Sequence, residues 1–175
     1  KLLVDWARET GLKMIQLLPV NDTTASFSWK DSYPYSAISA YALHPMLLNL
    51  EEVAGKEHAK VVKSLAIKKR QLNKLPEINY EQVMKFKTGA IRELYELQKE
   101  RFLEDFNYFT FFELNRFWLE PYAAFSYLRD KYGTADFAKW KTLSTYDEDA
   151  VQRVVSPSQK HYDEIAVHYF TQYHL

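Results

Sequence analysis

One short apolar run, residues 12–20, constrains the fold of this 175-residue chain more than any other segment. It follows Gly11 and has Pro19 near its end, and its length and composition predict a β-strand buried on both faces, as in a parallel sheet. The ten residues before it have helical periodicity, so the two segments predict one helix-to-strand step of an α/β protein. Nothing in the last two thirds of the chain predicts a second strong strand.

From residue 51 onward the periodicity is helical. Residues 57–72 carry an apolar stripe among many lysines, which predicts a solvated helix and not a nucleic-acid surface. Residues 80–105 form a second apolar face, with Asn79 as the expected N-cap. The aromatic stripe within residues 106–127 predicts buried core, and a partner surface is the alternative.

Capping signals divide the rest of the chain. Pro121 is expected to open a new helix that ends at Gly133. Thr145 and Glu148 have the spacing of a capping box, which predicts a short helix. Ser158 is the expected cap of a final helix. The chain is therefore predicted to be mainly α-helical.

Residues 21–45 have neither helical nor strand periodicity and predict a long loop directly after the strand; residues 46–50 predict a short strand or an extended segment. Enzymes built on parallel sheets place ligands at the end of the strand where this loop begins. Sugar rings have apolar faces and hydroxyl rims, so flat aromatic groups beside polar ones suit them. The loop carries both kinds of side chain: Trp29, Asp31, Ser32, Tyr33 and Tyr35. The alternative is that these aromatic residues pack against the helical region.

Two carboxylates in the same loop, Asp22 and Asp31, invite comparison with the acid pair of a glycosidase. Two acids nine residues apart are common by chance, and we expect them to cap turns, Asp22 ahead of Thr23 and Thr24, and Asp31 ahead of Ser32. We assign them no catalytic role.

Composition excludes several other classes. There is no cysteine, and Lys plus Arg balance Asp plus Glu at 23 each, so neither a thiolate site nor a global field for nucleic acid is expected. No apolar run approaches 18 residues, so no membrane interaction is expected. His161 and His168 lack the further ligands of a metal set, and no nucleotide-binding motif occurs, so we expect no metal and no cofactor.

The chain begins without Met, inside a helical pattern, and stops inside another. We expect a piece of a longer protein, and a processed terminus is the alternative. A (β/α)8 barrel takes about 250 residues, so this chain could be only a slice of one.

Several segments stand out in order along the chain: Val4-Asp5-Trp6-Ala7, Gln16-Leu17-Leu18-Pro19, Asp31-Ser32-Tyr33-Pro34-Tyr35, His44-Pro45-Met46-Leu47-Leu48, Asn79-Tyr80, Trp118-Leu119-Glu120-Pro121-Tyr122 and Phe170-Thr171-Gln172-Tyr173. Together they resemble the 4-α-glucanotransferase family, that is, amylomaltase or disproportionating enzyme, glycoside hydrolase family 77. Asn21-Asp22-Thr23-Thr24, and Tyr33 between Ser32 and Pro34, are more similar to the larger bacterial and plant-cytosolic branch. Short members have Asp-Ser-Pro-Tyr there.

The resemblance implies a fragment of a (β/α)8 TIM barrel. Residues 1–50 would supply an early barrel helix, strand and substrate loop, and residues 51–175 a helical insertion subdomain leading back to the barrel. The family's nucleophilic Asp, acid/base Glu and stabilising Asp would lie beyond Leu175, so no catalytic residue is expected in this chain.

The resemblance also implies a function. The parent protein would transfer α-1,4-glucan segments between maltooligosaccharides with retention, through a glycosyl-enzyme intermediate, in the cytoplasm and without a cofactor. The substrate-binding residues would be Tyr35, Ser32, Asp31, Trp29 and Tyr33. An α-glucan hydrolase of the same clan and a non-catalytic helical interaction module are the alternatives. An excised slice would expose strand edges and apolar faces, so self-association is also expected.

Overall fold

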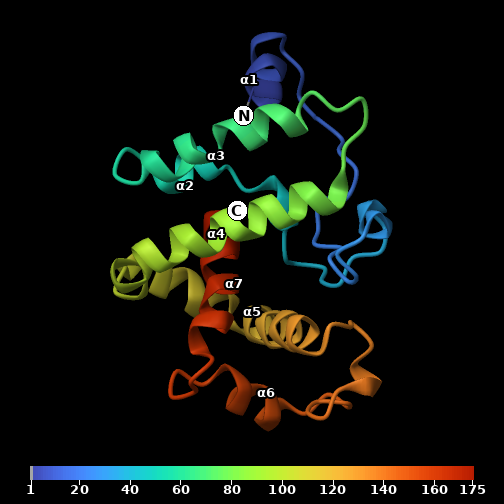
Figure 1. Ribbon diagram of the computed structural model, residues 1–175, viewed down its shortest axis with the longest axis vertical. Coiled ribbons are helices and arrows are strands. Elements are labelled where there is room, and N and C mark those ends of the chain that lie inside the picture. Colours follow the sequence, from blue (N-terminus) through green and yellow to red (C-terminus); the bar gives the residue numbers. More distant parts are fainter. Residues whose placement is uncertain (1) are drawn as a thin grey trace.

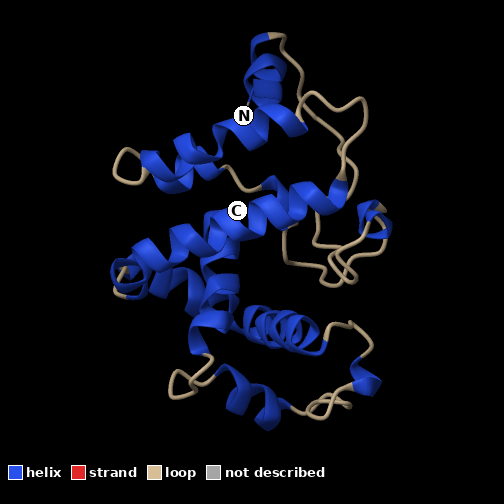
Figure 2. Ribbon diagram, in the orientation of Figure 1, coloured by secondary structure: helices blue, strands red, loops and turns tan. Residues whose placement is uncertain are grey.

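The computed structural model describes residues 2–175, which contain seven α-helices, three short 3₁₀ turns and no β-strand (Figures 1 and 2). The α-helices are α1 (Leu2–Glu9), α2 (Leu50–Ala54), α3 (Ala59–Leu72), α4 (Tyr80–Leu103), α5 (Phe106–Tyr132), α6 (Glu148–Val155) and α7 (Tyr162–His174). The 3₁₀ turns are η1 (Trp29–Ser32), η2 (Pro45–Leu47) and η3 (Phe137–Lys139). The mainly helical prediction is confirmed.

Helix α7 packs against both α4 and α5 and forms the centre of the molecule (Figure 1). Helices α2 and α3 contact α4 on one side, and α6 contacts α5 on the other. Leu94, Leu119, Ile165 and Phe170 are completely buried where α4, α5 and α7 meet. This aromatic and aliphatic core provides the rigid support on which the loop of residues 21–45 lies.

The predicted strand at residues 12–20 is wrong for this chain. The segment is extended but pairs with no strand, and its apolar side chains are largely exposed, Met14 at 85% and Leu18 at 64%. A strand buried on both faces requires neighbours for its backbone and side chains, and residues 2–175 provide none. Residues 46–50 are not a strand either, because Asn49 caps α2 there by accepting from the Glu51 N–H.

Polar side chains cap the N-termini of four of the seven described α-helices, α2, α4, α5 and α6. Asn79 begins α4 as predicted, its side chain accepting from the Gln82 N–H at 3.0 Å, and the helix ends at Leu103, two residues before the predicted end. Asp105 instead caps α5 by accepting from Asn107 N–H. Gly133 ends α5 at φ 66°, in the left-handed conformation that glycine adopts without strain, as predicted.

The expected break at Pro121 is wrong, because α5 runs through this position as one helix of 27 residues. A proline inside a helix costs about 3 kcal/mol through a lost hydrogen bond and a steric clash. Its neighbours Leu119, Tyr122 and Ala123 are buried in the core, and their packing against α7 and the loop offsets that cost.

Two further caps differ from the prediction. Asp147, not Thr145, caps α6 by accepting from the Ala150 N–H at 2.6 Å. The helix α7 follows His161 and has no side-chain cap, so Ser158 lies in the preceding turn. In these two cases the helix begins two or three residues later than the expected cap indicates.

The aromatic stripe of α5 is core only in part. Tyr108, Tyr122 and Tyr127 are buried, whereas Phe106 and Phe117 are 77% and 66% exposed. The expectation that this stripe is core is therefore only partly correct, because aromatic residues occur all around α5 and α7 covers only one face. The lysine-rich segment predicted as a solvated helix over residues 57–72 is helix α3, and Val61 is its buried residue.

Candidate functional site

The loop of residues 21–45 is held closed at its base by its own backbone. Asn21 and Leu43 form an isolated antiparallel bridge, the Asp22 N–H donates to the Ala42 carbonyl at 2.8 Å, and the His44 N–H donates to the Val20 carbonyl at 2.9 Å. The Ile38 N–H also bonds the Asp22 carbonyl at 2.8 Å. The two stems of the loop, residues 20–24 and 38–44, therefore lie side by side, and residues 25–37 project from them.

Asp31 shapes the projecting part. Its buried carboxylate accepts from the Ser26 N–H at 2.9 Å, from the Ser26 hydroxyl at 2.9 Å and from the Phe27 N–H at 2.6 Å. Phe27 has a positive φ of 56°, an unfavourable conformation for a bulky residue, and these bonds hold it there. Asp31 therefore fixes a turn, as expected. Its partners, however, are Ser26 and Phe27, which precede it, whereas the sequence predicted a turn ahead of it at Ser32.

Asp22 has the turn-capping role that was predicted for it. Its carboxylate is almost completely buried and accepts from the Thr24 N–H at 2.9 Å and the Thr24 hydroxyl at 2.6 Å. The Tyr122 hydroxyl of α5 donates to the other carboxylate oxygen at 2.7 Å. Because both loop carboxylates are engaged by protein donors, neither is placed as a free acid or base.

The aromatic residues predicted to bind substrate are on the outside of the loop. Trp29, Tyr33 and Tyr35 are 66%, 59% and 62% exposed, and the rings of the two tyrosines lie 5.5 Å apart. Ser32 is exposed beside them and donates its hydroxyl hydrogen to the Trp29 carbonyl. The Trp29 N–H bonds the carboxylate of Glu81 in the first turn of α4. Four of the five predicted residues thus form an exposed surface, and the fifth, Asp31, lies buried beneath it.

The helical region holds this loop through residues to which the sequence analysis gave no role. The Arg129 guanidinium donates to the Thr24 carbonyl at 2.6 Å, and lies 4.7 Å from the centre of the Phe27 ring. Gln172 of α7 bonds the backbone of Leu43. Arg129 lies in the last turn of α5 and is followed by Asp130 and Lys131, so its sequence context is that of an ordinary solvated charge and gave no signal.

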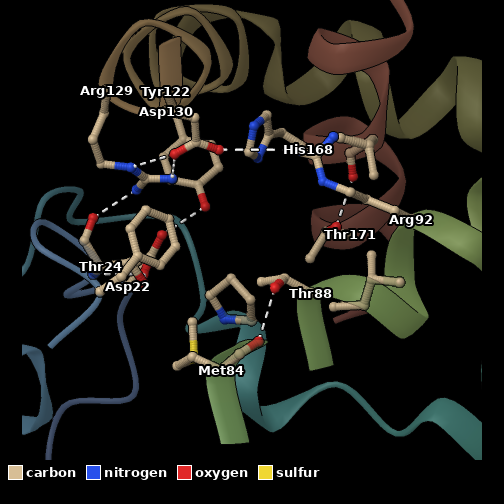
Figure 3. Close-up of a pocket in the computed structure, with 14 residues that line it drawn as sticks. Asp22, Thr24, Met84, Thr88, Arg92, Tyr122, Arg129, Asp130, His168 and Thr171 are labelled. Carbon is tan, nitrogen blue, oxygen red and sulfur yellow. Dashed lines mark hydrogen bonds and ion pairs between the residues drawn. The ribbon is translucent and has the colours of Figure 1, made fainter. Parts of the chain in front are cut away.

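A pocket of about 240 Å³ with both apolar and charged lining residues lies between the loop and α4, α5 and α7 (Figure 3). Its lining residues include Asp22, Thr24, Arg92, Arg129, Asp130 and His168. The Nε2 atom of His168 is buried without a hydrogen-bond partner. Burial first, and then the positive charges of Arg129 and Arg92, lower the pKa of His168 from 6.5 to about 3, so the ring is neutral at pH 7.

This low pKa predicts that the chain loses stability in mild acid. The unfolded state takes up a proton on His168 below pH 6.5, whereas the folded state takes it up only near pH 3, so protonation favours unfolding in between. The free energy of unfolding should fall by up to about 1.4 kcal/mol per pH unit from this group between pH 6 and 4. Burial also lowers the pKa of His44 and His174, which adds in the same direction.

Urea unfolding of the wild type and of His168→Gln across this range measures the effect. The variant should show a smaller loss of stability on acidification, because glutamine does not titrate. Equal slopes for the two proteins would contradict the assignment to His168.

Metal binding has no support within residues 2–175: no group of three or more His, Asp or Glu side chains there is placed to hold an ion. No described helix is long and apolar enough to cross a membrane.

The family model of glycoside hydrolase family 77, described as 4-alpha-glucanotransferase, matches residues 1–175. The chain belongs to this family.

Three similar proteins carry that enzyme name. The 4-alpha-glucanotransferase DPE2 of rice, Oryza sativa subsp. japonica, is 38% identical over 175 residues, which is all of this chain and 18% of that protein. The 4-alpha-glucanotransferase of Chlamydia caviae is 35% identical over 147 residues, 82% of this chain and 26% of that protein. That of Chlamydia trachomatis is 29% identical over 172 residues, 98% of this chain and 31% of that protein. The chain thus spans about a fifth to a third of these relatives, and no solved structure matches it.

Proposed function

We propose that this chain is the glucan-binding part of a 4-α-glucanotransferase, and that the reacting carboxylates of that enzyme lie outside it. Family membership across the whole chain supports the enzyme class. The observation that carries the proposal is the exposed aromatic surface of the loop, held in a defined shape by Asp31 although none of its three rings is buried. Aromatic rings kept in water on an ordered loop suit a ligand with apolar faces.

The barrel origin of residues 1–50, with residues 51–175 as a helical insertion, is also a proposal. It is supported by the apolar and extended residues 12–20, which lack the neighbours that a buried parallel strand needs. The aromatic loop follows this segment directly, where the ligand loops of a barrel follow its strands. The cytoplasmic location and the closer similarity to the larger branch of the family remain predictions.

In the proposed reaction the complete enzyme cleaves an α-1,4-glucan, retains the glycosyl unit covalently and passes it to a sugar hydroxyl. The part played by this chain is binding. Tyr35 stacks on the sugar at the cleavage point, and Ser32 contacts a hydroxyl beside it. Trp29 and Tyr33 are outer platforms, and Asp31 keeps the turn that presents all four.

Incubation with maltotriose tests the activity. The complete protein that contains this chain should produce a ladder of shorter and longer oligosaccharides, because a second sugar replaces water as the acceptor. The 175-residue chain alone should release no maltose, because a barrel site is assembled from several strand ends. Glucose and maltose as the only products would favour the hydrolase alternative, and no conversion at all would favour the helical interaction module. Maltose release by the chain alone would show that it contains the reacting groups.

Removal of the Tyr35 ring tests the proposed site. In the complete protein, Tyr35→Ala should lower transfer by one to three orders of magnitude, at roughly 1.4 kcal/mol per tenfold change. Its fold should be unaffected because the ring is 62% exposed. Tyr146→Ala, which removes a ring 68% exposed in another loop, is the matched control and should leave the rate unchanged. Transfer by Tyr35→Ala within about twofold of the wild type would reject the role of Tyr35.

The isolated chain should associate with itself, because large apolar side chains of α1, residues 12–20 and α5 face water; they include Leu2, Met14, Leu18, Phe106 and Phe117. Size-exclusion chromatography at several concentrations should show species larger than 20.7 kDa. Replacing Phe106 and Phe117 by lysine should shift the chain toward the monomer. A monomeric wild type at low salt and high concentration would contradict the expectation.

A further inference from the structure

The amide of Gln172 binds the loop as a neighbouring strand would. The Leu43 N–H donates to its Oε1 at 2.9 Å, and its Nε2 donates to the Leu43 carbonyl at 2.8 Å. Gln172 is buried in α7, and 129 residues separate it from Leu43. One side chain therefore satisfies both backbone groups of a stem residue that also forms the bridge to Asn21.

Tyr122 connects this contact to the opposite stem. Its hydroxyl donates to the Asp22 carboxylate at 2.7 Å and accepts from the Gln172 Nε2 at 3.4 Å. The backbone N–H and the hydroxyl of Thr24 both donate to the Asp22 carboxylate. The result is one buried network that joins α5 and α7 to both stems of the loop.

This network is rigid for a physical reason. Burial, together with the Asp22 charge, raises the pKa of Tyr122 well above 10, so its hydroxyl keeps the proton that it donates. A buried polar group without a partner costs free energy, so neither stem can shift without breaking a bond in the interior. Among the described residues, the projecting segment Trp29 to Tyr35 makes one hydrogen bond outside the loop, from the Trp29 N–H to Glu81.

We propose that Tyr122 and Gln172 are positioning residues for glucan transfer, which set the placement of the aromatic surface from beneath. The inference rests on the proposed function of that surface. Neither side chain is part of the surface formed by Trp29, Ser32, Tyr33 and Tyr35. A displacement of about 1 Å can cost about a hundredfold in rate even when the change lies far from the reacting atoms.

Two substitutions in the complete protein remove the bonds with little change in shape. Tyr122→Phe deletes the hydroxyl that binds Asp22. Gln172→Glu keeps an acceptor for the Leu43 N–H but replaces the donor to the Leu43 carbonyl with a carboxylate oxygen. Tyr169→Phe is the matched control, because the Tyr169 hydroxyl on α7 is buried and has no partner.

We expect both test variants to lower the kcat of maltotriose disproportionation about tenfold or more, with a smaller change in KM, because a misplaced loop still touches sugar but loses alignment at the cleavage point. Hydrogen exchange measured by mass spectrometry should become faster in peptides covering residues 21–45 and stay unchanged in α4. Tyr169→Phe should match the wild type in both measurements.

A wild-type kcat in folded Tyr122→Phe and Gln172→Glu would overturn the proposal. If the melting temperature also fell while kcat stayed unchanged, the two side chains would have a purely structural role. A wild-type protein without transfer activity would instead remove the proposed function. In that case the exchange rates of residues 21–45 would still decide whether the two side chains hold the loop.

Discussion

The buried carboxylate of Asp22 is the interaction on which the arrangement of loop and helices depends. A charge withdrawn from water is stable only where donors surround it, and here the Thr24 backbone and hydroxyl come from the loop, and the Tyr122 hydroxyl from α5. Because these donors come from segments about a hundred residues apart, satisfying the charge fixes one segment on the other. The helical core and the exposed aromatic surface thus become one structural unit, with the pocket beside His168 at their junction (Figure 3).

Local chemistry was predictable at several positions where one residue acts on nearby backbone groups, although Thr145 and Ser158 did not form their expected caps. Asn79 caps a helix, Gly133 ends one, and Asp22 closes a turn over Thr24, because each acts on backbone groups within four residues of itself. The loop of residues 21–45 was also predictable, since no periodicity competed with its polar and aromatic mixture. The hydrogen bonds inside the loop were not predictable, because the partners of Asp31, Ser26 and Phe27, precede Asp31 and reach its carboxylate only through the way the loop turns.

Outcomes decided by tertiary packing were beyond the sequence. Pro121 usually interrupts a helix, but the burial of Leu119, Tyr122 and Ala123 keeps α5 continuous around it. Residues 12–20 have the composition of a buried strand and remain exposed, because a sheet requires partners that the described residues do not supply. Likewise, Gln172 lies between Thr171 and Tyr173 in α7, and nothing near it in the sequence reveals that it binds Leu43.

These long-range bonds also bear on the order in which the chain acquires its structure. The helices form through contacts between residues close in sequence, which is the fast part of folding. The loop contacts join residues separated by 100 to 129 positions, Asp22 with Tyr122 and Leu43 with Gln172. A ribosome makes the loop early, yet its stems gain their last partner only when α7 has been synthesised and has packed. The loop that carries Trp29, Tyr33 and Tyr35 is therefore synthesised before α7, but it reaches its final structure only after α7 has packed.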